Sequence, residues 1–346
     1  MIENNRYSRQ VNLPQVGMTG QEKLKNARVL VIGAGGLGCA VLPYLVASGI
    51  GHIGLMDGDV VSQSNLHRQV LYTDADILKP KVTIAEKRLK ALNPNVEIAA
   101  INGYFTGKNA QETVKSYDLI VDATDAIAAR YLINDACVLC NKPFVHASIY
   151  RFQAQVSVFN YNNGPTYRCL FPNPPKEAPS CAEAGVLGTS VALAGMLQAN
   201  EVMKIILGIG EVLSGQLLLK DGLSNKQEIF RFKKNERISI TQQRFEKEHL
   251  QELRMIDFSS AKEKNGIFLD VREKQEKPTI KLPNLVQISV QNLRDALGEL
   301  PRDQPIFIFC QSGKRSKSSY KLLKESDFDE VYCLKENAPE LEQLVS

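Results

Sequence analysis

The chain has 346 residues, of which 44% are hydrophobic and 23% are charged, and its formal net charge is +4. This composition is typical of a globular protein with about two domains. The charge is small and spread along the chain, which excludes the basic patch that a nucleic-acid-binding surface needs.

Three further features indicate the cellular setting. The first residues are polar, so we expect no secretory signal. The most apolar stretch, residues 186–207, is interrupted by polar and charged residues and is typical of a buried helix, not of a membrane span. Seven cysteines without regular spacing argue against a disulfide framework. We therefore expect a cytoplasmic protein that does not cross a membrane.

The first two-thirds of the chain alternate between predicted strands and helices. Residues 28–32 form a continuous apolar run, which predicts a buried parallel strand, and the glycine-rich segment GAGGLG follows at 33–38. A helix at 81–92 ends before Pro94, since proline disfavours helical conformation in the preceding residue. This alternation predicts a mostly parallel sheet. Further strands are expected at 53–57, 118–122 and 143–146.

The pattern changes twice further along the chain. Polar and apolar residues alternate at 155–160 and 215–232, which predicts antiparallel strands that complete the sheet. Charged residues then dominate, until buried strands at 266–270 and 305–309 predict a second, smaller α/β domain. The predicted fold is thus a Rossmann-like mixed sheet, half parallel and half antiparallel, followed by a small α/β domain. The expected boundaries are 1–235 for the first domain, 236–262 for a linker and 263–346 for the second domain.

The glycine-rich segment predicts a site for nucleotide phosphates. Gly33 permits the turn, Gly35 lets the backbone approach a phosphate, and Gly38 lets the helix pack closely on the strand. The helix N-terminus adds N–H groups that favour an anion. Asp57, at the end of the next strand, is placed to bind ribose hydroxyls. Alone, these features favour a nicotinamide-dependent oxidoreductase.

The residues after Asp57 favour a triphosphate instead. Arg68 can make bidentate contacts with phosphate oxygens, and Lys81 opens the next helix as a second cation. Asp125 follows the strand at 118–122 and is a candidate magnesium ligand. Any one of these charges alone is more often a surface group. Their joint placement at the carboxyl ends of parallel strands predicts a site for ATP and Mg²⁺. In a dehydrogenase these three charged residues would have no role.

Several motifs in order along the chain resemble the MoeB/ThiF/HesA family, relatives of the ubiquitin-activating enzymes. The resemblance covers residues 5 to about 232. It implies a homodimer that transfers AMP from ATP to the C-terminal glycine of a ubiquitin-like sulfur-carrier protein ending in Gly-Gly, as in molybdopterin or thiamine biosynthesis. The motifs are RYSRQ at 6–10, GAGGLG at 33–38, the segment 57–69 with its SNLHRQ core, Lys81, Thr124-Asp125 and SCAEAGVLG at 180–188.

The resemblance also implies roles for individual residues. Arg9 would reach the phosphates bound by the partner subunit, and Asp125 would bind magnesium. The transition state would be stabilised by charge, and no nucleophile from the enzyme is needed for adenylation. The expected nucleotide contacts are Gly33, Gly35, Gly36, Gly38, Asp57, Asp59, Ser64, Asn65, Arg68, Gln69, Lys81 and Asp125.

The chain departs from the family in two places. Many members hold a structural zinc with two CxxC pairs. Here only Cys169 stands at the first position, and residues 238–241 contain no cysteine, so we expect no zinc site. The one CxxC, at 137–140, is expected to pack in the core. Ala126 stands where the family usually has Asn, which would weaken contacts with the nucleotide.

Two cysteines are candidates for sulfur chemistry. Cys181 lies in a loop that, by resemblance, crosses over the carrier's tail, and it would either link covalently to the carrier or be structural. The C-terminal domain resembles a rhodanese, with the loop CQSGKRS at 310–316. Backbone N–H groups and Arg315 would favour the Cys310 thiolate and a persulfide on it, with sulfur supplied by thiosulfate or a cysteine desulfurase. Departures at Lys281 and 336–337 leave a degraded, regulatory or docking domain as an alternative.

Three other functions stay open at this point. A nicotinamide-dependent oxidoreductase would explain only the glycine loop and Asp57. Adenylation of a modified tRNA base would keep the chemistry and change the acceptor, but the lack of a basic patch weighs against it. A non-catalytic scaffold is disfavoured because Arg9, Arg68, Lys81 and Asp125 are all present.

Overall fold

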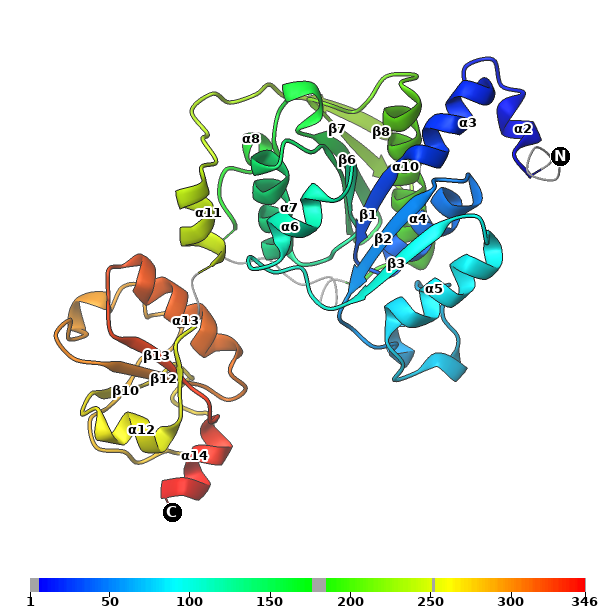
Figure 1. Ribbon diagram of the computed structural model, residues 1–346. Helices are drawn as coiled ribbons and strands as arrows, with labels where there is room; N and C mark the ends of the chain where they lie inside the picture. The colour runs from blue at the N-terminus through cyan, green and yellow to red at the C-terminus, as the bar shows by residue number, and fades with distance from the viewer. Residues whose placement is uncertain (1–5, 176–184, 251–252, 346) are drawn as a thin grey trace. The chain divides into compact units, whose positions relative to one another are not determined.

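The computed structural model describes residues 6–175, 185–250 and 253–345. It divides into two compact units, 1–250 and 251–346 (Figure 1).

The first unit is built on an eight-stranded sheet with the strand order β3-β2-β1-β4-β5-β6-β7-β8. The strands from β3 to β5 are parallel, and β5 to β8 pair antiparallel. The predicted mixed sheet is therefore confirmed. The strands are β1 (Arg28–Ile32), β2 (His52–Asp57), β3 (Glu97–Asn102), β4 (Leu119–Asp122), β5 (Phe144–Tyr150), β6 (Gln153–Phe159), β7 (Gln216–Asp221) and β8 (Gln227–Arg231).

Helices cover both faces of this sheet. The side chains of β1 alternate between them, since Val29 and Val31 pack into one core layer and Leu30 and Ile32 into the other. The first layer is closed by α3 (Gly17–Asn26), α4 (Gly36–Ala47), α5 (Lys81–Leu92) and α10 (Gly188–Leu207). The second is closed by α6 (Ala110–Lys115), α7 (Ile127–Leu139), α8 (Tyr167–Leu170) and α11 (Gln242–His249). A short helix, α2 (Ser8–Val11), precedes α3, and 3-10 turns lie at Gln63–Asn65, Asp74–Asp76 and Tyr161–Asn163.

The apolar helix α10 occupies the core of the first unit. By length and composition it is the one helix among the described residues that could cross a membrane, but half of its apolar window is buried inside the unit. Gln198, one of the polar residues that interrupt the stretch, donates from Nε2 to the backbone oxygen of Asp122 at 2.7 Å. Its polar side chain is therefore used inside the unit, at the end of β4.

The second unit is a smaller parallel sheet with the order β11-β10-β12-β13-β9. Helix α13 packs on one face, while α12 and α14 pack on the other. The strands are β9 (Met255–Ile256), β10 (Ile267–Asp270), β11 (Leu285–Gln287), β12 (Ile306–Phe309) and β13 (Val331–Leu334). The helices are α12 (Phe258–Glu263), α13 (Lys314–Glu325) and α14 (Ala338–Val345), with a 3-10 turn at Leu297–Glu299.

The segment 236–262, which the composition indicates as a linker, is divided between the two units. Helix α11 belongs to the first unit, where Phe245 is buried beside α7. Strand β9 and helix α12 belong to the second, where β9 pairs with β13. The composition of the segment does not predict these contacts, because only a few of its side chains are buried and most of the others are charged.

Candidate active sites

The carboxyl ends of β1, β2 and β4 surround a cavity of about 430 Å³. This volume lies in the range of small-molecule sites. Most of the predicted nucleotide contacts line it, although they come from segments far apart in the chain: Gly33, Gly35, Gly36, Asp57, Asp59, Asn65, Arg68, Gln69, Lys81 and Asp125.

The glycine loop has no room for side chains at two positions. Gly33 has φ +104°, and a Cβ there would lie 2.6 Å from the backbone oxygen of Ala123. A Cβ on Gly38 would lie 2.1 Å from the backbone oxygen of Gly33, so α4 packs directly against the loop. Asp57 fixes the loop further, because its carboxylate accepts from the N–H of Ala34 and of Asp59, each at 2.7 Å. The side chain predicted to bind ribose thus also holds the phosphate loop in shape.

Lys81 is delivered to the cavity by a short pairing of two segments. Its backbone N–H donates to the oxygen of Asp59 at 3.0 Å, next to a bridge between Val60 and Pro80. The Lys81 side chain is only 5% exposed, and its ammonium contacts the Asp59 carboxylate at 2.9 Å. That carboxylate also accepts from the Tyr104 hydroxyl at 2.8 Å. Burial raises the pKa of Asp59, but the bonds from Lys81 and Tyr104 outweigh it and hold that pKa below its usual value. Lys81 is a buried cation whose charge faces the cavity.

Arg68 and Gln69 form another wall of the cavity. The guanidinium of Arg68 donates to Asn65 Oδ1 at 2.9 Å and to the backbone oxygen of Ser64 at 3.3 Å, which fixes its direction. Gln69 is 4% exposed, and its Oε1 is buried without a partner among the described residues. Buried polar atoms normally have partners, so this one favours a bound ligand that donates a hydrogen bond.

Asp125 and Ala126 line the cavity on a loop that sequence analysis did not explain. The loop follows β4 and is held by Asp122, whose Oδ1 accepts from the N–H and the hydroxyl of Thr124 at 3.1 and 2.7 Å. His146 Nδ1 lies 2.7 Å from the other oxygen of Asp122, and both side chains are buried. The Asp122–His146 pair therefore positions the loop that carries Asp125.

Burial and hydrogen bonds together set the charges of the Asp122–His146 pair. Burial lowers the pKa of His146, so the neutral ring donates its Nδ1–H to Asp122. Burial raises the pKa of Asp122, but the bonds from His146 and Thr124 outweigh it and keep the carboxyl ionised. The signal in the sequence was Asp122, an Asp at a strand end three residues before Asp125. Its partner, 24 residues away, could be identified only in the fold.

Four expected residues stand apart from the cavity lining. Gly38 does not line the cavity but lets α4 pack against the glycine loop, and Arg9 is exposed on α2. Ser64 lies beside the cavity and gives its backbone oxygen to Arg68. Cys181 lies outside the described residues. Conversely, the lining includes Tyr104 and Arg130, which the sequence analysis did not name, and Thr124, which it named only as part of a motif.

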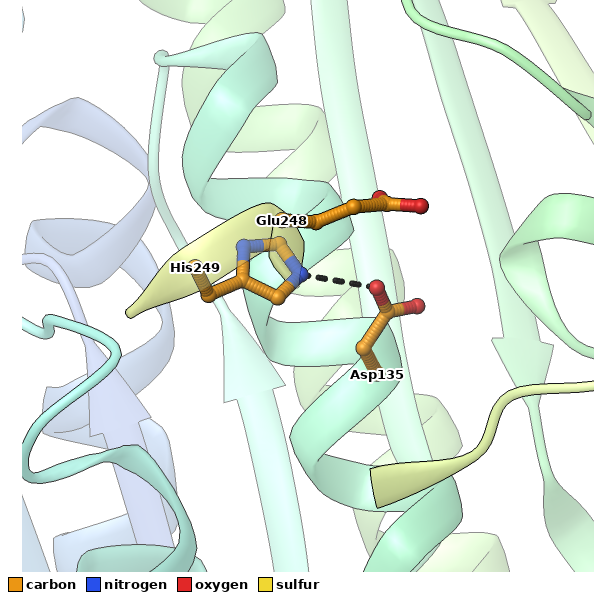
Figure 2. Close-up of side chains that lie close together, drawn as sticks. All are labelled: Asp135, Glu248 and His249. Carbon is orange, nitrogen blue, oxygen red and sulfur yellow. Dashed lines mark hydrogen bonds and ion pairs between the residues drawn. The ribbon is translucent and has the colours of Figure 1, made fainter. Parts of the chain in front are cut away.

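A cluster of metal-ligating residue types lies on the opposite helical layer (Figure 2). Asp135 of α7 and Glu248 and His249 of α11 bring their ligand atoms within 4.8 Å of one another. His249 Nε2 lies 2.7 Å from Asp135 Oδ2. Arg168, which is 1% exposed, donates to both oxygens of Asp135 at 2.7 and 2.6 Å and also to Glu248. The guanidinium of Arg168 supplies the positive charge that a metal ion would bring, so the described contacts make the cluster an ion-pair network.

The same region contains the position at which many family members hold a structural zinc and at which we expect none. Cys169 Sγ accepts from the N–H of Thr166 at 3.4 Å and of Asn235 at 3.3 Å, which joins the two segments that carry CxxC pairs in other family members. One thiol does not fit a four-ligand zinc site. Here hydrogen bonds to Cys169 connect these segments, and Arg168 pairs with Glu248 further along the chain. Cys137 packs in the core, where burial raises its pKa.

The second unit places Cys310 between β12 and α13. The sulfur accepts from the N–H of Ser316 at 3.4 Å and lies 3.7 Å from its hydroxyl. Burial raises the pKa of Cys310, but backbone N–H groups of Ser316, Ser312 and Arg315 outweigh it and lower the pKa below its usual value. By contrast, burial raises the pKa of Cys333 on the neighbouring β13 to about 12. Both thiols are 1% exposed, so what distinguishes them is the loop around Cys310, whose N–H groups favour the thiolate.

The departures from the rhodanese pattern at residues 336–337 have structural roles. Glu336 accepts from the N–H of Phe258 at 3.0 Å, and Asn337 and Glu340 exchange hydrogen bonds of 2.9 and 3.1 Å at the start of α14. These bonds anchor α12 and α14 and leave the loop around Cys310 intact.

Comparisons with known proteins match both units. The sequence matches the ThiF family over residues 7–240 and a rhodanese-like domain over residues 242–340. It is 54% identical over 228 residues to a sulfur carrier protein adenylyltransferase of Thermus thermophilus, covering 64% of this chain and 84% of that protein. It is 37% identical to the probable adenylyltransferase/sulfurtransferase MoeZ of Mycobacterium tuberculosis, covering 95% of this chain and 90% of that protein. The structure of E. coli MccB with ATP superimposes with a TM-score of 0.61 at 25% identity, covering 68% of this chain and 74% of that one.

Proposed function

The chain belongs to the ThiF family and carries a rhodanese-like domain, and from this premise we propose that it adenylates the C-terminal glycine of a ubiquitin-like sulfur carrier for thiocarboxylate formation. The observation that carries the proposal is the cavity in which the glycine loop, Arg68 and Lys81 meet. Dinucleotide binding does not need two cations beside a glycine loop, whereas the departure of pyrophosphate from ATP does.

The residues around the cavity supply position and charge. The carrier's carboxylate attacks the α-phosphorus of ATP, the bond to the β-phosphate oxygen breaks, and pyrophosphate leaves with the negative charge. Lys81 and Arg68 stabilise this charge, and Lys81 does so from a buried position where electrostatic interactions are strong. Asp57 holds the loop against which the phosphates rest. No side chain has to act as a nucleophile in this step.

Asp125 is the residue that would hold magnesium. Its carboxylate is exposed on the cavity wall, on a loop fixed by Asp122, and oxygen ligands of this kind suit Mg²⁺. The ion, when bound, neutralises charge on the phosphates. We expect no structural zinc, because Cys169 stands alone where two cysteine pairs would be needed.

The second unit supplies sulfur. A persulfide on Cys310 attacks the carbonyl carbon of the acyl-adenylate, AMP leaves, and an acyl disulfide joins the carrier to Cys310. Cys181 then attacks the Cys310 sulfur of this acyl disulfide, which releases the thiocarboxylate and leaves a Cys181–Cys310 disulfide. An external dithiol must reduce this disulfide before the next cycle. The lowered pKa of Cys310 supports its role as the thiol that accepts sulfur from thiosulfate or a cysteine desulfurase.

The proposed setting of the reaction is the cytoplasm, and the proposed assembly is a homodimer. All cysteines that the structure describes are free thiols, which suits a reducing cytoplasm. Arg9 is exposed on α2, outside the cavity of its own chain, which supports a homodimer in which it completes the partner's site.

Pyrophosphate–ATP exchange tests the adenylation. Candidate carriers ending in Gly-Gly should support exchange, and the same carriers without the last glycine should not. Exchange that needs no carrier, or none with any carrier, would overturn the proposal. For the sulfur step, Cys310→Ala should retain exchange and lose thiocarboxylate formation with either sulfur donor. Thiocarboxylate formation that survives this substitution would exclude Cys310 as the carrier of sulfur.

A further inference from the structure

The only cation of the Cys310 loop whose side-chain contacts the structure describes is already paired. Arg315 Nη1 and Nη2 contact the two carboxylate oxygens of Glu276 at 2.5 and 2.7 Å. Glu276 is also fixed from behind, since its Oε1 accepts from the N–H of Glu273 at 2.9 Å. Both side chains are about 30% exposed, with 31% for Arg315 and 28% for Glu276, so the pair lies at the surface of the unit.

The pair is fully charged at neutral pH and has no net charge. Bonds from Arg315 lower the pKa of Glu276 to about 2, and bonds from Glu276 raise the pKa of Arg315. Arg315 also lies within electrostatic range of the Cys310 sulfur. An anion delivered to that sulfur therefore meets a guanidinium whose Nη1 and Nη2 already contact a carboxylate, and the negative charge of that carboxylate lies beside it.

A second guanidinium near the loop is neutralised in the same way. Arg272 is 1% exposed and donates to both oxygens of Asp270, at 2.7 Å from Nη2 and at 2.9 and 3.1 Å from Nε. Its Nη1 donates to Gln311 Oε1 at 3.1 Å, so it supports the loop from below. Lys314 is a third cation in the loop sequence, and its side chain lies outside what the structure describes.

We propose that Glu276 is a specificity-determining residue of the sulfur-transfer site: by occupying Arg315 it disfavours a dianionic donor such as thiosulfate and favours a persulfide. This inference rests on the proposed role of Cys310. A dianion must displace Glu276 to gain the end-on contact with Nη1 and Nη2 of Arg315, and the carboxylate of Glu276 repels it until then. A persulfide presents one terminal sulfur and needs no such contact, because the backbone N–H groups around Cys310 already stabilise the charge that forms there.

The test measures thiocyanate formation from thiosulfate and cyanide by the full chain. Glu276→Gln keeps the size of the side chain and removes its charge, so the KM for thiosulfate should fall on the order of tenfold. Glu273→Gln is the matched control. It removes a carboxylate charge three residues before Glu276, from a side chain that does not contact Arg315 in the described structure. The rate of sulfur transfer from a cysteine desulfurase persulfide should stay within about twofold of the native rate in both variants, because a persulfide needs no contact with Arg315.

The double variant Glu276→Gln/Arg315→Ala shows whether Glu276 acts through Arg315. Its KM for thiosulfate should equal that of Arg315→Ala alone. Equal KM values for Glu276→Gln and Glu273→Gln, with thermal unfolding unchanged, would overturn the inference, as would a gain that persists without Arg315. Loss of all transfer in Cys310→Ala tests the proposed function separately, so the two failures are distinguishable.

Discussion

At the scale of single residues, Lys81 is the buried cation on which adenylation should depend most. Lys81→Met keeps the length of the side chain and removes the charge, so pyrophosphate–ATP exchange should fall on the order of 10²- to 10³-fold. The matched control is Lys79→Met, because Lys79 is exposed, does not line the cavity, and donates from its ammonium to the backbone oxygen of Ala75. Similar exchange rates for the two variants would show that Lys81 does not stabilise the transition state.

Cys310 allows a second prediction at this scale, from the pH dependence of its reactivity. Its pKa lies below the usual value of 9.0, so its thiolate fraction at neutral pH exceeds that of an ordinary cysteine and declines as the pH falls through the lowered pKa. Alkylation by a small reagent, followed by mass spectrometry across pH, should give a midpoint below 9.0 for Cys310. Cys333, whose pKa is raised to about 12, is the internal control and should stay unmodified. A midpoint for Cys310 at or above that of an ordinary cysteine would show that the surrounding N–H groups do not stabilise its thiolate.

At the scale of elements, ion pairs of Arg168 with Asp135 and Glu248 hold α11 against α7 and α8. His249 of α11 also contacts Asp135 of α7 directly (Figure 2). Asp135→Asn leaves the buried guanidinium with one weaker partner, so the first unit should lose about 3–5 kcal/mol of unfolding free energy. The exposed pair of Glu86 and Lys90 provides the comparison, since Glu86→Gln should cost only about 0.5 kcal/mol. Hydrogen exchange of α11 in the full chain, together with urea unfolding, measures both.

The same ion pairs predict an acid sensitivity. Burial raises the pKa of Asp135, but the bonds from Arg168 and His249 outweigh it, so its folded pKa lies below the usual value of 3.8. A carboxyl with a lowered folded pKa contributes stability above its unfolded pKa and loses it as the pH falls toward the folded one. The stability difference between the native chain and Asp135→Asn should therefore be constant from about pH 5 upward and shrink below about pH 4. A difference that does not depend on pH would exclude this titration.

At the scale of the whole molecule, the position of Arg9 predicts shared active sites. If Arg9 completes the partner's site, Arg9→Ala and Lys81→Met should each be inactive alone, and mixing them should restore activity. After subunit exchange, half of the dimers would carry one intact site, which corresponds to about one quarter of the native activity. No recovery, in a mixture shown to have exchanged subunits, would place Arg9 in the site of its own chain or outside the reaction.

Local patterns in the sequence determined much of this protein. Continuous apolar runs predicted β1, β2, β4, β10 and β12, because a strand buried on both faces has no polar side to record. The glycine loop was visible for an equally local reason, since neighbouring backbone leaves Gly33 and Gly38 no room for a Cβ. Strand β3 was not predicted, because only Ile98 among its residues is fully buried and its pattern is weak.

The tertiary structure decided which side chains meet. Lys81 and Asp59 pair across 22 residues, Asp122 and His146 across 24, and Arg315 and Glu276 across 39. No local spacing predicts such pairs, because charges and hydrogen bonds act through space once packing has fixed the backbone. Local patterns were enough to predict the phosphate loop, the cations and a candidate reactive thiol. Only the fold showed that Asp122 supports the Asp125 loop, that Arg168 pairs with the acidic residues of the candidate metal cluster, and that Glu276 pairs with the cation beside Cys310.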